Sequence, residues 1–95
     1  MTPAFTVQTS PRFERLARRL RRQHPEFTTL LREAFDILET DPYNQSRRHA
    51  IKKLTGVQED GQWRLRLGRL RFRYDVAGAT VELKYCGLRR EDTYR

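Results

Sequence analysis

Residues 63–67 read Trp-Arg-Leu-Arg-Leu, and residues 70–76 read Leu-Arg-Phe-Arg-Tyr-Asp-Val. Large apolar side chains alternate with charged ones in both stretches, and residues 81–85, Val-Glu-Leu-Lys-Tyr, continue the alternation. Because successive side chains of a β-strand point to opposite faces, this period of two predicts three strands. Short glycine-containing segments at 68–69 and 77–79 separate the strands, so we expect an antiparallel meander.

The alternation gives the predicted meander two unlike faces. One face collects the apolar residues, among them Trp63, Tyr74 and Tyr85, which we therefore expect to face the core. Neighbouring strands lie about 4.8 Å apart, so guanidinium groups crowded on the opposite face repel each other unless an anion sits among them. We therefore interpret this opposite face as an anion-binding surface. It carries five cations, Arg64, Arg66, Arg71, Arg73 and Lys84, against two carboxylates, Asp75 and Glu82.

The residues before the meander predict two helices and a short strand. Residues 10–24 begin with Ser-Pro, an N-cap followed by proline at the first helical position, and carry apolar residues at helical spacing. Residues 25–40 begin with a proline that ends the first helix and can open a second, which has a broad apolar stripe. Residues 4–8 suggest a first strand, and residues 46–56 look like a connector with at most a helical turn. We expect an α+β domain in which an antiparallel helix hairpin covers the apolar sheet face and leaves the cationic face open.

Length and composition limit the class of protein. Ninety-five residues suit a single domain, residues 1–95, and a net charge of +8 carried mostly by arginine indicates a polyanionic partner. The single cysteine, Cys86, excludes an internal disulfide; it has the parity of the cationic face, although a lone cysteine is usually a small buried residue. Two histidines and one cysteine give no plausible zinc site, so we expect no metal and no cofactor. Without a signal peptide or an apolar segment of membrane-spanning length, we expect a cytoplasmic protein with no membrane partner.

An RNA backbone bound to the cationic face could be cleaved there. RNA carries its own nucleophile, the 2′-hydroxyl, whose attack on the adjacent phosphorus adds negative charge to the phosphoryl oxygens. Fixed guanidinium groups aimed at those oxygens stabilise that charge more than they stabilise the ground state. A base should take the 2′-proton and an acid should assist the leaving 5′-oxygen. Such chemistry needs no metal.

Four short stretches form an ordered set with characteristic spacing. They are Lys-Leu-Thr-Gly at 53–56, Gln-Trp-Arg-Leu-Arg-Leu-Gly at 62–68, Leu-Arg-Phe-Arg-Tyr at 70–74 and Tyr-Cys-Gly-Leu-Arg-Arg-Glu-Asp-Thr-Tyr-Arg at 85–95. Together they resemble the RelE/ParE toxins of bacterial and archaeal toxin–antitoxin systems. The order of strand, helix pair and meander also matches, so the resemblance covers essentially the whole chain. It implies a ribosome-dependent mRNA endonuclease that works in the A site and is held inactive by a cognate antitoxin.

The resemblance also implies roles for single residues. Arg64 and Arg66 fall where RNA-cleaving members place basic residues, and Arg71 falls on their phosphate-contacting arginine. Arg89 matches an arginine that stabilises the transition state, and Tyr94 matches a tyrosine that stacks on a base or assists proton transfer. These five are the expected catalytic residues. The further RNA-binding candidates are Lys52, Lys53, Arg73, Lys84 and Arg90.

The chain departs from the best-studied type of member, which has lysines where this chain has Arg64 and Arg66. Arginine holds its proton too tightly to be an ordinary general base, so the base stays open. Lys52, Lys53 and His49 lie just upstream and are the candidates. Two other functions also remain open: a ParE-like inhibitor of DNA gyrase, and a nonenzymatic RNA- or ribosome-binding module.

Overall fold

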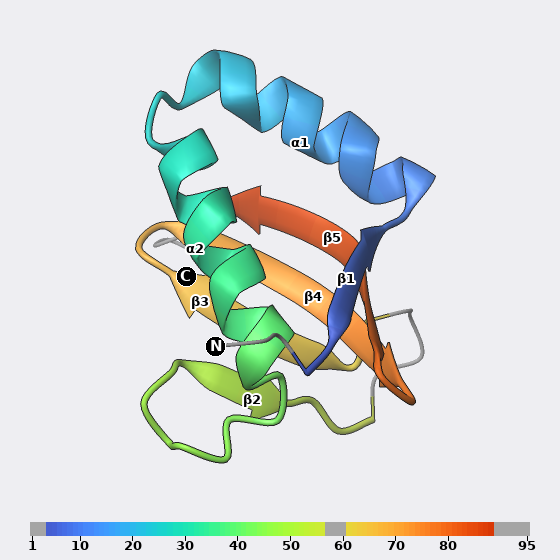
Figure 1. Ribbon diagram of the computed structural model, residues 1–95. Helices are drawn as coiled ribbons and strands as arrows, with labels where there is room; N and C mark the ends of the chain where they lie inside the picture. Colours follow the sequence, from blue (N-terminus) through green and yellow to red (C-terminus); the bar gives the residue numbers. More distant parts are fainter. Residues whose placement is uncertain (1–3, 57–60, 89–95) are drawn as a thin grey trace.

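A five-stranded mixed sheet with two helices packed against it makes up the described part of the protein (Figure 1). The structure, a computed structural model, describes residues 4–56 and 61–88. The strand order is β1-β5-β4-β3-β2, with β1 parallel to β5 and the other pairs antiparallel. The elements are β1 (Thr6–Thr9), α1 (Pro11–Gln23), α2 (Phe27–Thr40), β2 (Ile51–Lys53), β3 (Trp63–Leu67), β4 (Leu70–Ala77) and β5 (Thr80–Leu88).

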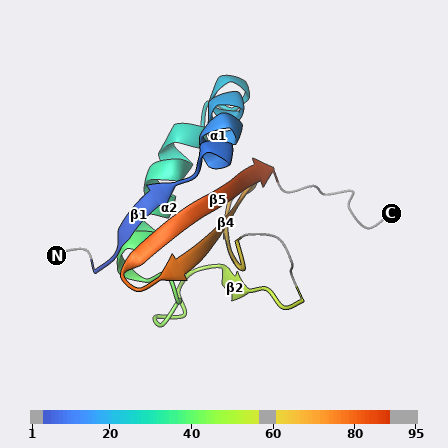
Figure 2. The same cartoon turned by 90° about the vertical axis from the view of Figure 1, so that its right-hand side faces the viewer.

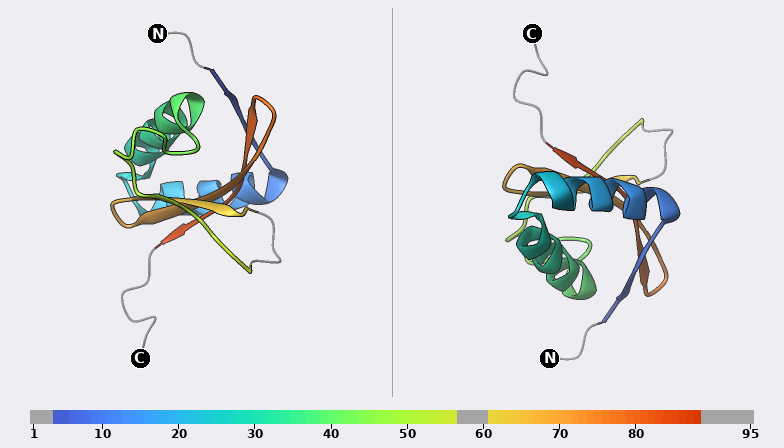
Figure 3. Two further views of the ribbon diagram at one scale, coloured as in Figure 1. Left: turned by 90° about the horizontal axis from the view of Figure 1, so that it is seen from below. Right: turned by 90° about the horizontal axis from the view of Figure 1, so that it is seen from above.

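The two helices begin and end close to where the sequence predicts. The Ser10 hydroxyl accepts a hydrogen bond from the backbone N–H of Phe13 at 3.0 Å, and Pro11 occupies the first turn of α1, where its missing N–H costs nothing. His24 ends α1, and α2 begins at Phe27, just after the proline. The two helices cross obliquely in Figure 3, and Figure 2 places both on the same side of the sheet. The predicted α+β arrangement of strand, helix hairpin and meander is confirmed.

One hydrophobic core lies between the helices and the sheet, and the period-two pattern of β3 and β4 explains it. Every second residue of β3 and β4 points into this core, including the fully buried Leu65, Phe72 and Tyr74. The Tyr74 hydroxyl donates to the carbonyl oxygen of Pro42 at 2.6 Å, and burial raises the pKa of this phenol. Trp63 packs against the core beside Tyr74, so both residues face the helices as predicted. The remaining buried apolar residues are Phe13, Ala17, Leu20, Phe27, Ala34, Ile37, Leu38, Leu70, Val81, Leu83 and Cys86.

The connector before the meander contains a strand that the sequence reading missed. Ile51–Lys53 forms β2 and pairs with β3, with Ile51 opposite Leu65 and Lys52 opposite Arg64. Ile51 packs against the core, and the backbone N–H of Arg66 donates to the Ala50 carbonyl at 3.0 Å. A strand of three residues is too short to display an alternating pattern, so the prediction of a connector was wrong for these residues.

A β-bulge in β5 reverses which side chains face the core. Arg73 pairs with Tyr85, whereas the residue after Arg73 pairs with Leu83, so Lys84 is an extra residue without a partner in β4. Past Lys84 the alternation is shifted by one position. Cys86 therefore lies in the core with 1% of its surface exposed, and Tyr85 lies on the arginine side. The prediction that Tyr85 faces the core was wrong, because strict alternation assumes a strand without a bulge.

The buried thiol gives a first prediction: Cys86 should not react with iodoacetamide at about pH 8 while the protein is folded. Burial raises the pKa of this thiol to about 12, and the Glu14 carboxylate adds to the increase. An unfolded thiol titrates near 8.5, so the unfolded state loses this proton first, and the free energy of unfolding should fall as the pH rises above about 8.5. The alkylation rate measured against urea concentration checks this; labelling of the folded protein as fast as a free thiol contradicts it.

Candidate nucleic-acid interface

The sheet face turned away from the helices carries a row of side chains that crosses four strands. Lys52, Arg64, Arg73 and Tyr85 are successive Cα partners on β2, β3, β4 and β5. Residues directly opposite each other have Cβ atoms about 4.5–5.5 Å apart, and their side chains share a face. Three cations and one aromatic ring therefore stand side by side. In the structure the cationic face is formed by Lys52, Arg64, Arg66, Arg71 and Arg73; Lys52 was not among the residues predicted for this face from the meander.

A second row lies two residues further along the strands, about 7 Å away. In it Arg66 is opposite Arg71, and Arg71 is opposite Gly87. Glycine offers no side chain, and the Tyr85 ring lies over this position, so the Tyr85 hydroxyl stands beside Arg71. Within residues 4–56 and 61–88, Arg66 and Arg71 make no ion pair or side-chain hydrogen bond. Like charges directly opposite each other destabilise a sheet, so this pair is a better anion site than a structural one.

Arg73 contributes to the local structure as well as to the charge of the face. Its Nε donates to the carbonyl oxygen of Gly61 at 2.8 Å, while the Asp75 carboxylate accepts from the backbone N–H groups of Gly61 and Gln62, each at 2.9 Å. Gly61 has a φ of 87°, and a Cβ there would lie 2.9 Å from the Cβ of Arg73, so only glycine fits. Arg73 and Asp75 thus fix the chain just before β3. This role was not predicted from the sequence, in which Asp75 was counted only as a negative charge among the cations.

Two lysines predicted to bind RNA, Lys53 and Lys84, make other contacts in the structure. Lys53 neighbours Lys52 in β2 and points to the opposite side, where its Nζ lies 5.7 Å from the centre of the Trp63 ring. Lys84 occupies the bulge, and its Nζ lies 3.3 Å from a carboxylate oxygen of Glu82. Of the predicted cations, the structure brings Lys52 and the four arginines together, and it does not bring Lys53 to the cationic face.

His49, a candidate base, lies in the loop between α2 and β2. Its Nε2 is 3.7 Å from a carboxylate oxygen of Asp41, the residue that follows α2. Burial acts to raise the pKa of Asp41, but hydrogen bonds from Ser46 and Gln45 outweigh it and lower the pKa below its usual value. His49 therefore belongs to a loop that Asp41 organises. The predicted site residues Arg89, Arg90 and Tyr94 lie outside the described residues.

Tyr85 and Gly87 belong to the site although the sequence reading did not include them. The bulge that turns Tyr85 outward has no sequence signature of its own. One signal was available: with strict alternation, Cys86 would point to solvent from a strand whose other outward residues are charged. A small apolar residue on the charged side of a strand is an indication that the pattern has shifted.

Sequence comparison identifies no relative: no protein-family model matches the chain, and neither does any curated protein. A chain of the archaeal RelE–RelB complex from Pyrococcus horikoshii OT3 superposes with a TM-score of 0.67, over 93% of this chain and 98% of that one, at 23% sequence identity. The fold is RelE-like.

The RelE-like fold confirms the architecture that the four-stretch resemblance implied, including the first strand and the helix hairpin. At 23% identity the likeness concerns the fold. Neither helix of the RelE-like fold, among the residues described, has the length and apolar character needed to cross a membrane.

Proposed function

We propose that this protein is the toxin of a toxin–antitoxin pair and that it inhibits translation by cleaving mRNA in the ribosomal A site. The observation that carries the proposal is the pairing of Arg66 with Arg71, both half-buried, on the sheet face turned away from the helices, beside Arg64 and Arg73. Such like-charge pairs weaken the sheet, and a bound phosphodiester offsets that cost. The RelE-like fold and the ordered resemblance to RelE/ParE toxins support the same function, and the fold match to a RelE–RelB complex supports a cognate antitoxin as partner.

In the proposed reaction the RNA supplies the nucleophile. The 2′-oxygen attacks the adjacent phosphorus, the bond to the 5′-oxygen breaks, and the products are a 2′,3′-cyclic phosphate and a 5′-hydroxyl. Arg66 and Arg71 would bind the two non-bridging oxygens, whose negative charge grows in the transition state. Arg64 and Arg73 would hold the neighbouring phosphate, and Arg89 would add to the charge stabilisation. The protein groups suffice for this route, so we propose no metal or cofactor.

The proposed reaction also needs a base for the 2′-proton and an acid for the 5′-oxygen. Of the three candidate bases, Lys52 is the one whose Cα partner is an arginine of the cationic face. Lys53 contacts Trp63 and His49 sits beside Asp41, so Lys52 is our choice for the group that takes the 2′-proton. Tyr94 is our choice for assisting the 5′-oxygen, with Lys84 and Arg90 as further RNA contacts. A ribosomal substrate also implies action in the cytoplasm.

The proposal is tested by adding the purified protein to a translating extract and mapping mRNA 5′ ends by primer extension. We expect new ends within A-site codons, which appear only while ribosomes are translating. Intact mRNA together with loss of gyrase-driven plasmid supercoiling would instead establish a ParE-like inhibitor. Ribosome association without either effect would establish a nonenzymatic binding module.

A further inference from the structure

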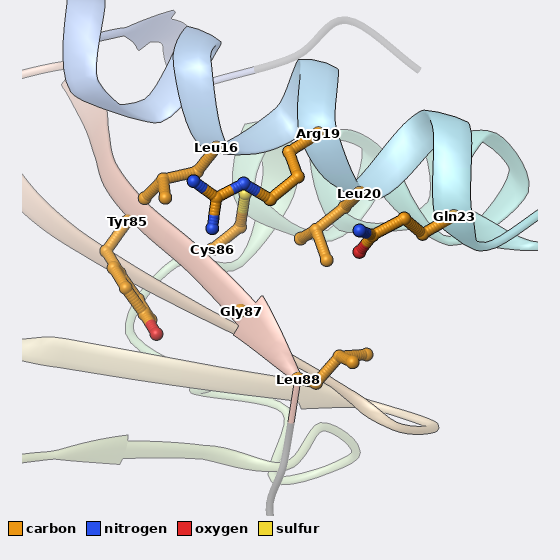
Figure 4. A pocket seen from close by; sticks show the side chains of 8 residues that line it. All are labelled: Leu16, Arg19, Leu20, Gln23, Tyr85, Cys86, Gly87 and Leu88. Carbon is orange, nitrogen blue, oxygen red and sulfur yellow. The ribbon is translucent and has the colours of Figure 1, made fainter.

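A cavity of about 370 Å³ lies between α1 and the last residues of β5 (Figure 4). Strand β1 covers β5 only from Thr80 to Leu83, so beyond the bulge the outer edge of β5 faces α1 across this cavity. The cavity is within the size range of small-molecule sites, roughly 300–1,000 Å³. Its lining includes apolar side chains and hydrogen-bonding groups: Leu16, Arg19, Leu20 and Gln23 from α1, with Tyr85 and Leu88 from β5.

Tyr85 joins this cavity to the cationic face. The bulge turns its side chain to the side of Arg73, its Cα partner, while the same residue lines the cavity at the strand edge. The ring lies along β5 over Gly87, where an added Cβ would overlap the phenol hydroxyl and lie 2.8 Å from Cζ. Because Gly87 is the Cα partner of Arg71, the Tyr85 hydroxyl lies next to the row that holds the proposed anion site.

Two cations of α1, Arg12 and Arg19, lie beside Tyr85 and the cavity, and the Glu14 carboxylate lies close enough to Cys86 to help raise the pKa of that thiol. The guanidinium carbon of Arg12 lies 5.3 Å from the centre of the Tyr85 ring, a cation–π contact that holds the ring against the strand edge. Figure 4 shows the Arg19 side chain extending from α1 toward β5, and Gln23 one turn further along the helix. The cavity thus combines an aromatic ring and leucine side chains with an amide that can both donate and accept hydrogen bonds.

A ligand that matches this lining has flat apolar faces, a hydrogen-bonding edge and an attached anion. We propose that the cavity holds a nucleobase of the RNA substrate, stacked on Tyr85, next to the phosphate bound by Arg66 and Arg71. This inference rests on the proposed function and adds a substrate-contacting residue to it. The base lies against Tyr85 and the leucines, Gln23 reads its edge, and Arg19 faces the flanking backbone. The arrangement is that of a single-stranded RNA site, in which aromatic rings carry the bases and cations follow the backbone.

The test uses ribosomes programmed with an mRNA whose A-site codon carries the fluorescent base 2-aminopurine. A 2′-deoxy nucleotide at the scissile position removes the nucleophile, so binding is observed without cleavage. Co-sedimentation measures how much protein binds, and quenching of 2-aminopurine reports stacking. We expect the wild-type protein and Tyr85→Phe to quench the base, and Tyr85→Leu to lose the quenching and bind about 5- to 100-fold more weakly.

A second variant and a control keep the result interpretable. Gln23 is exposed, so Gln23→Ala should leave the fold intact and change the relative cleavage of codons that differ at the nucleotide held in the cavity. Tyr43→Leu, at an exposed tyrosine remote in sequence from β5, should behave as wild type in both assays. Circular dichroism shows whether each variant is folded; if Tyr85→Leu does not fold, Gln23→Ala decides.

Failure of the inference differs from failure of the proposed function. If the wild-type protein neither binds programmed ribosomes nor cleaves their mRNA, both are overturned. If it binds and cleaves, but quenching survives Tyr85→Leu and codon preference survives Gln23→Ala, the nucleobase site alone is overturned. The cavity would then belong to another occupant, such as an antitoxin segment.

Discussion

Arg71→Ala is expected to lower the rate of A-site mRNA cleavage by about 100- to 1,000-fold and to abolish growth arrest on induction. Arg71 lies between Arg66 and Gly87 on the sheet face turned away from the helices, so a phosphoryl oxygen bound by the two arginines meets its guanidinium directly. Arg71→Ala would remove one of the fixed donors that stabilise the negative charge developing on that oxygen in the transition state. Arg89→Ala should have the same effect if Arg89 supplies a further donor. Primer extension and growth curves measure the loss.

The same Arg71 substitution should not destabilise the protein. Removing one member of a like-charge pair relieves repulsion, so the unfolding free energy should stay unchanged or rise by about 0.2–1 kcal/mol. Arg32→Ala, at an exposed position on α2, removes the same charge away from the sheet and serves as the matched control. Growth arrest that persists in both Arg71→Ala and Arg89→Ala would refute their assigned roles, and a large loss of stability would make Arg71 a structural residue.

The cationic face could be predicted from sequence because its cause is local. In β3 and β4 every second residue is apolar, and a strand has to direct those residues to the core, which leaves Arg64, Arg66, Arg71 and Arg73 on the other side. No information from distant parts of the chain is needed. The helix boundaries were predictable for the same reason, since Ser10 and the prolines act within one turn.

The rest of the site depends on contacts between distant residues. The bulge at Lys84 follows directly after the four residues of β5 that pair with β1, and neither the register with β1 nor the register with β4 can be read from residues 80–88 alone. The hydrogen bonds that Arg73 and Asp75 make with Gly61 join residues more than ten positions apart. In the sequence alone, nothing distinguishes these three residues from an ordinary glycine and an ordinary pair of opposite charges. The bulge is the reason that Tyr85 belongs to the site.

The core under the arginines gives the second large effect: Phe72→Ala should lower the free energy of unfolding by about 3–5 kcal/mol. Phe72 is fully buried, and its ring centre lies 6.4 Å from that of Phe13 on α1. Small domains are stable by about 5–15 kcal/mol, so this loss is a large share of the total. Urea unfolding measures it, and Phe72→Leu, which keeps most of the apolar volume, should lose clearly less. A loss below about 1 kcal/mol would contradict the packing described.

Phe72 also couples the core to the proposed chemistry, since it stands between Arg71 and Arg73 on β4. Because Phe72 points into the core, its neighbours Arg71 and Arg73 point to the opposite side of the sheet. At a temperature where Phe72→Ala remains folded, the pairing of β4 with β3 and β5 should still hold both guanidinium groups in register. We therefore expect its cleavage rate per folded molecule to stay within about threefold of wild type, whereas Arg71→Ala is stable and inactive. If Phe72→Ala were as inactive as Arg71→Ala while fully folded, the cationic face would depend on packing in a way that strand register does not explain.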